Sequence, residues 1–106
     1  MYEVPDWLHR GEYIRTRTTR KGNPYETNIE PEWADEAYLD EDAVELDPDP
    51  ASVKGQSKRT IGWSESAGFL VTVITVRDPQ DGRLWGVNAF KSNDTDQRRY
   101  EQGGQS

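Results

Sequence analysis

The sequence predicts a small α+β domain, in which a short antiparallel sheet packs against one helix before it and one after it. Two observations lead to this class. Between Lys58 and Phe90, runs of strand-forming residues alternate with turn residues. On either side of this region, helix-starting residues are followed by acidic first turns. A chain of 106 residues has the size of a single domain.

The strongest predicted strand is Phe69–Val76, FLVTVITV, whose two alternating faces are both largely apolar. This pattern is typical of a central strand that is covered on both sides. Lys58–Trp63 and Arg83–Phe90 are predicted to flank it, across turns at 64–68 and 78–82. Three consecutive strands with short links predict an antiparallel meander.

Helices are predicted at both ends of the meander. Pro31 suits the first position of an acidic helix that runs to about Asp40, and the prolines of the DPDP sequence at 47–50 exclude any continuation. After the third strand, Asn93 is predicted to cap a last helix, with Asp96 at the third helical position as in a capping box. A Gly-Gly pair then ends this helix.

Residues 1–26 are predicted to form an N-terminal arm, and residues 27–106 a single domain. Within the arm, Tyr13–Thr18 is β-branched and alternating, so the sequence leaves open an edge strand and an extended arm. Only 32% of the chain is apolar, and it contains 4 Trp and 5 Tyr. Because each large ring removes much surface from water, we expect the strand aromatics to pack in the core or at an interface.

Composition excludes several kinds of site. There is no cysteine, so neither a disulfide nor a thiolate metal site can form, and the sole histidine, His9, cannot build a histidine cluster. We therefore expect no metal and no cofactor. The sequence has no apolar run long enough to cross a membrane and no secretory pattern at its start, so the expected location is the cytoplasm.

Charge is unevenly distributed along this acidic chain, whose net charge is −7. Such a charge argues against non-specific binding of nucleic acid by the whole surface. From Glu26 to Asp49 the sequence is rich in Asp and Glu and contains no Lys or Arg, whereas 10–21 carries a basic block. The acidic run either binds a basic partner or forms a solvated helix face followed by a loop.

The order of these segments resembles a known family. An acidic helix, a loop containing Asp-Pro, then IGWSESAGFLVTVITVR at 61–77 and VNAFKSNDTDQRRYEQG at 87–103 are similar to the later part of BrnT-type toxins of bacterial type II toxin–antitoxin pairs. The resemblance covers about residues 27–103. It implies a RelE-like fold and a metal-independent endoribonuclease that an antitoxin neutralises. Phe90 and Thr27 depart from the pattern, because the family usually has Arg and often His at these places.

The resemblance implies an RNA site built from basic residues, since Arg and Lys can stabilise the charge that develops on phosphorus during cleavage. The predicted catalytic residues are Arg59, Arg77 and Lys91, and the predicted RNA-binding residues are Arg83, Trp85, Asn88 and Arg98. The alternative is that these cations are scattered salt-bridge partners of the acids. The function is then that of a non-catalytic relative, which binds a protein through its acidic face. The expected partners are accordingly RNA and a cognate antitoxin or another basic protein, with no membrane.

Overall fold

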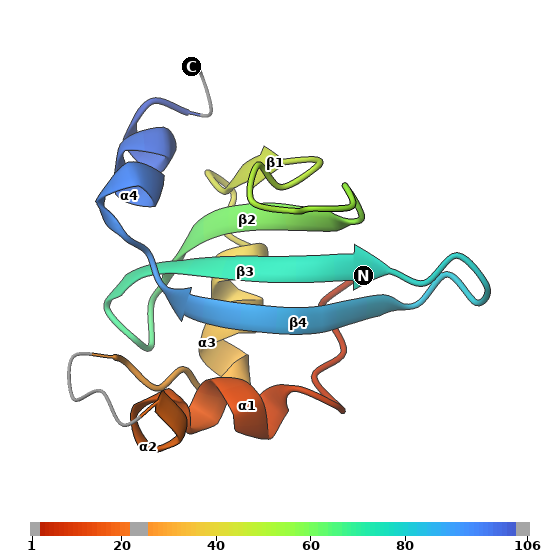
Figure 1. Ribbon diagram of the computed structural model, residues 1–106. Helices are drawn as coiled ribbons and strands as arrows, with labels where there is room; N and C mark the ends of the chain where they lie inside the picture. The colour runs from red at the N-terminus through yellow and green to blue at the C-terminus, as the bar shows by residue number, and fades with distance from the viewer. Residues whose placement is uncertain (1–2, 22–25, 104–106) are drawn as a thin grey trace.

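The computed structural model describes residues 3–21 and 26–103, and it has an α+β fold built on a four-stranded antiparallel sheet (Figure 1). The strands lie in chain order, β1-β2-β3-β4, so the predicted class and the predicted meander are confirmed. The elements are α1 (Gly11–Arg15), α2 (Arg17–Lys21), α3 (Pro31–Tyr38), β1 (Val44–Leu46), β2 (Ser57–Ser64), β3 (Phe69–Arg77), β4 (Leu84–Lys91) and α4 (Asp94–Glu101).

The central strand is β3, as its two apolar faces predict. It pairs with β2 from Phe69 to Val76 and with β4 from Val71 to Arg77. On one face, Val71 and Val73 are completely buried in a core that includes Ile14 of α1 and Ala37 of α3. Because side chains alternate along a strand, Thr72 and Ile74 point to the opposite face, where Thr72 Oγ1 donates to Asp96 of α4.

Close packing of α3 on the sheet depends on Gly62 in β2. A Cβ atom on this glycine would overlap the backbone carbonyl of Ala37, so only glycine lets the helix approach this closely. The helix begins at Pro31, as predicted, but it ends at Tyr38 and not at Asp40. The chain then turns back as β1, which pairs with β2 and forms one edge of the sheet.

Both alternatives left open for Tyr13–Thr18, an edge strand and an extended arm, are wrong, because this segment belongs to α1 and α2. Gly11 and Ile14 are both buried, and their spacing of three residues places them on the same face of a helix. The free edge of β4 is taken instead by Asp6, whose N–H donates to Leu84 O at 2.8 Å and whose carbonyl accepts from Gly86 N at 2.9 Å. The N-terminal residues are therefore joined to the sheet, and Ile14 belongs to its core.

The last helix, α4, begins as predicted. The Asn93 side chain accepts a hydrogen bond from Asp96 N at 2.9 Å, which satisfies one of the free N–H groups of the first turn. The chain leaves the helix at Gly103, whose φ of 65° is favourable only for glycine. In Figure 1, α4 lies beyond the end of β4, on the side of the sheet where β1 and β2 lie.

Candidate functional site

Arg59, predicted to be catalytic, is buried in an ion-pair network. Its Nε donates to Asp49 Oδ1 at 2.8 Å, and its Nη1 donates to Asp96 Oδ2 at 2.7 Å. Asp96 is completely buried and also accepts hydrogen bonds from Thr72 Oγ1 and Arg99 Nη1, both at 2.8 Å. Every strong interaction of this guanidinium is therefore with a carboxylate of the same chain, and the network joins α4 to the sheet.

The other two predicted catalytic cations are exposed and lie far apart. Arg77 forms a two-pronged ion pair with Glu3, at 2.7 Å for each contact. Lys91 lies over the ring of Phe69, 5.1 Å from its centroid. Lys91 is opposite Val71 on β3, whereas Arg77 is the last residue of that strand. At about 3.3 Å per residue, the two cations are separated by about 20 Å along the sheet.

The predicted RNA-binding residues are also dispersed. Arg83 pairs with Asp6 at 3.2 Å and lies over the ring of Trp85, 5.2 Å from its centroid. The Asn88 side chain accepts from Arg17 Nη1 at 2.9 Å, at the edge of β4. Arg98 is exposed on α4. The structure thus brings Arg83 and Trp85 together, and it does not bring the set as a whole to one surface.

A different group of side chains meets where α3, β2 and α4 converge. We call it the Trp63 surface, and it consists of Glu36, Asp40, Trp63, Glu65 and Tyr100. Trp63 is 42% exposed, although strand aromatics were expected to be packed away. Its backbone N–H donates to Asp40 Oδ2 at 2.8 Å, and its indole Nε1 donates to Glu65 Oε2 at 2.8 Å. Tyr100 Oη donates to the same Asp40 oxygen at 2.7 Å.

Hydrogen bonds favour the ionised form of Asp40 and Glu36. Burial opposes ionisation of Asp40, but donors from Tyr100, Asp42 and Trp63 outweigh it, so the pKa of Asp40 lies below its ordinary value. The side chain of Ser66 is the main cause of a lowered pKa at Glu36. Among the described residues, neither acid forms an ion pair, and the same holds for Glu65. The surface therefore carries uncompensated negative charge at neutral pH.

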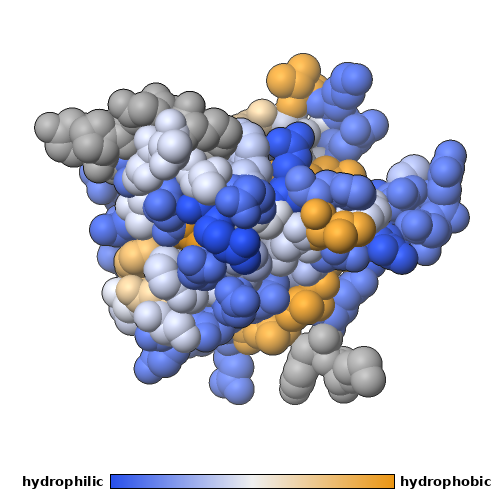
Figure 2. Space-filling model, turned by 90° about the horizontal axis from the view of Figure 1, so that it is seen from below, coloured by the Kyte–Doolittle hydropathy of each residue, from blue (hydrophilic) through white to orange (hydrophobic). Residues whose placement is uncertain are grey.

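A cavity of about 300 Å³ opens beside the exposed indole. Aromatic and aliphatic groups form much of its lining, which consists of Trp63, Gly68, Phe69, Leu70, Lys91 and Gln97. In the view of Figure 2, the described apolar side chains lie in small separate groups among hydrophilic ones. At this corner of the protein, an exposed tryptophan therefore lies beside a cavity with both apolar and polar lining.

Two further classes of site find no support in the described part of the chain. Within residues 3–21 and 26–103, no three side chains of His, Cys, Asp or Glu are placed to hold a metal ion. None of the helices in these ranges has both the length and the apolar character needed to cross a bilayer.

Comparisons with known proteins identify no relative of this chain. No family model, no curated protein and no solved structure matches it. The resemblance to BrnT-type toxins therefore stays a prediction from the sequence, and function has to be inferred from the geometry.

Sequence reasoning missed the Trp63 surface for an identifiable reason. The alternation of residues in β2 did not show which face of the strand the helices would leave uncovered, so it did not predict that Trp63 would be exposed. Close to Trp63 the sequence offers one acid, Glu65, whereas the acids of residues 36–42 are distant along the chain and approach Trp63 only in the fold. Of the two interpretations of the acidic run, binding of a basic partner is the one that this geometry favours.

Proposed function

We propose that the protein is a non-catalytic interaction module, which binds a basic segment of another protein at the Trp63 surface. The observation that carries the proposal is the half-exposed indole of Trp63, surrounded by carboxylates that no Lys or Arg of the described chain neutralises. Tryptophan is enriched among residues that dominate binding energy at protein interfaces. A partner that supplies Arg or Lys would complete the ion pairs that this chain leaves open.

The surface is organised before a partner arrives. Asp40 is fixed by three donors and Glu36 by Ser64 and Ser66, so neither carboxylate has to be ordered on binding. An arginine of the partner can contact the indole face and a carboxylate together, which combines a cation–π contact with an ion pair. The adjacent cavity of about 300 Å³ suits an apolar side chain next to that arginine.

The ribonuclease predicted from the resemblance receives less support. The predicted site needs its cations at one phosphate, yet Arg59 is engaged with two buried aspartates. Arg77 at the end of β3 and Lys91 at the end of β4 lie toward opposite ends of the strand pair. Of the two predicted kinds of partner, the basic protein is the one that the charges favour.

A fluorescence-anisotropy titration tests the proposal. The probe is a labelled peptide in which Arg, Leu and Gly repeat, and the two control peptides carry Glu in place of Arg or Ser in place of Leu. We expect the Arg-Leu peptide to bind most tightly and to weaken as salt is added. Trp63→Ala should weaken binding by about tenfold or more, as at interface hot spots.

A matched pair of variants separates the local surface from total charge. Glu41→Gln with Asp42→Asn neutralises two acids next to Asp40, and Glu12→Gln with Asp81→Asn neutralises two acids elsewhere. Both variants have the same net charge, and we expect only the first to weaken binding. If both double variants weakened peptide binding equally, the effect would come from the net charge of the protein and not from the Trp63 surface, and the proposal would be overturned. Cleavage of total RNA that is lost in Lys91→Ala and kept in Trp63→Ala would favour the ribonuclease instead.

A further inference from the structure

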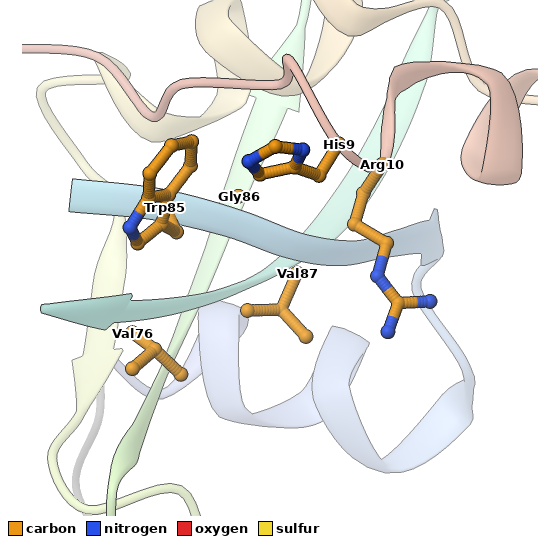
Figure 3. A pocket seen from close by; sticks show the side chains of 6 residues that line it. All are labelled: His9, Arg10, Val76, Trp85, Gly86 and Val87. Carbon is orange, nitrogen blue, oxygen red and sulfur yellow. The ribbon is translucent and has the colours of Figure 1, made fainter. Parts of the chain in front are cut away.

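A second cavity, of about 410 Å³, lies between the N-terminal segment and β4 (Figure 3). Figure 3 shows His9 beside Trp85, and Arg10 reaching past β4 from the same N-terminal segment. Val76, Gly86 and Val87 complete the lining. Its volume is within the range of small-molecule sites, and most of its lining is apolar.

The walls of this cavity are held in place by contacts over long sequence distances. Asp6 is hydrogen bonded to the backbone of β4 on both sides of Trp85, as described above. Trp7 Nε1 donates to Asp35 Oδ1 at 3.0 Å, and the Trp7 ring lies directly against Gly86, where an added Cβ would come within 2.5 Å of it. His9 and Arg10 therefore follow an anchored segment, and the cavity is present before any ligand binds.

Two features of the lining indicate the chemistry of a ligand. The rings of His9 and Trp85 lie 4.8 Å apart and form an aromatic wall. The exposed Arg10 at the rim has no carboxylate partner among the described residues, and its guanidinium lies over the Tyr13 ring, 4.8 Å from the centroid. An aromatic wall, an aliphatic floor and a free guanidinium complement a flat apolar group that carries a negative charge.

We propose that this cavity binds a small aromatic carboxylate, with its ring against Trp85 and His9 and its carboxylate on Arg10. The site is independent of the Trp63 surface. Trp85 is opposite Val76 near one end of β3, whereas Trp63 is opposite Leu70 near the other. About 20 Å of sheet separates the two places. Failure of one proposal therefore leaves the other standing.

The test is a titration followed by two-dimensional amide NMR of the full chain. The probe is 3-phenylpropionate, and the controls are 3-phenylpropanamide, which lacks the charge, and hexanoate, which lacks the ring. We expect the acid to shift the Trp85 indole signal and the Gly86 and Val87 amides, and to bind about tenfold more tightly than either control. Arg10→Gln should remove most of the preference for the acid over the amide.

Variants distinguish a site from general attraction to cations. Arg98→Gln removes an exposed cation on α4 and should leave binding of 3-phenylpropionate unchanged. His9→Ala removes one aromatic wall without touching the strand, so it remains informative if Trp85→Leu fails to fold. The proposal is overturned if the amide binds as well as the acid, if Arg98→Gln weakens binding as much as Arg10→Gln, or if 3-phenylpropionate shifts no signal of the cavity.

Discussion

Replacing Arg59 with Met tests whether this residue is structural or catalytic. The substitution keeps much of the aliphatic stem and removes the guanidinium that joins Asp49, in the segment before β2, to Asp96 in α4. Asp96 retains Thr72 and Arg99, whereas Asp49, which is 5% exposed, loses its cation. The main cost is thus an uncompensated charge at Asp49.

The size of the effect follows from this burial. Breaking one side of a buried ion pair typically costs about 3–5 kcal/mol. A domain of this size loses about 5 °C of Tm for each kcal/mol, so we expect the Tm of Arg59→Met to fall by about 15–25 °C. Urea unfolding monitored by circular dichroism gives the free energy directly, and it should show an unchanged slope and a lower midpoint.

Two variants complete the experiment. Arg77→Met breaks an exposed pair and should leave the urea midpoint nearly unchanged. A triple variant, Arg59→Met with Asp49→Leu and Asp96→Leu, should recover more than half of the lost stability, because apolar groups can replace a buried ion network. Equal midpoints for Arg59→Met and Arg77→Met would refute the reasoning. If Arg59→Met abolished a measured RNA cleavage without changing the urea midpoint, Arg59 would instead have a catalytic role.

Three other predictions concern packing, capping and pH. Gly62→Ala should lower the free energy of unfolding by about 1–3 kcal/mol or more, because the added methyl meets the carbonyl of Ala37; a change within error in urea unfolding would contradict this. Asn93→Ala should cost about 1 kcal/mol through loss of the cap, whereas Asn93→Ser should retain most of it. The hydrogen bond to Asp40 raises the pKa of Tyr100 from 10.0 to about 12, so its stabilisation is complete below pH 10 and is lost as the pH rises through about 12. In Asp40→Asn, absorbance at 295 nm should show Tyr100 ionising closer to pH 10, and an unchanged titration would exclude this contact.

The parts of the fold that could be predicted are those that depend on neighbouring residues. The alternation of Phe69–Val76 and the turn residues at 64–68 and 78–82 are local signals, and the meander followed from them. β1 is only three residues long and lies directly after an acidic segment, so no periodicity marked it. The Tyr13–Thr18 segment has strand-like composition, but burial of Ile14 against the sheet decided in favour of a helix.

The candidate sites depend on contacts between distant segments, which strand patterns do not contain. Alternation placed Arg59 on a strand face, but nothing local indicated that carboxylates from residues 49 and 96 would enclose it. His9 was unremarkable in the sequence, because its neighbour Trp85 lies far along the chain. What the sequence did contain was the excess of acids in 26–49, and this is the property that the Trp63 surface uses.

The attachment of the N-terminal segment to β4 has a consequence for how the chain is made. Asp6 pairs beside Trp85, so a ribosome must synthesise almost the whole sheet before residues 3–21 can find their place. Until then Ile14 and Trp7 have no core to enter, and they are exposed to chaperones and to other nascent chains. Closing so long a loop also delays folding relative to a protein with local contacts. In a cell, the cavity beneath His9 and Arg10 would thus form only after β4 has been synthesised and has joined the sheet.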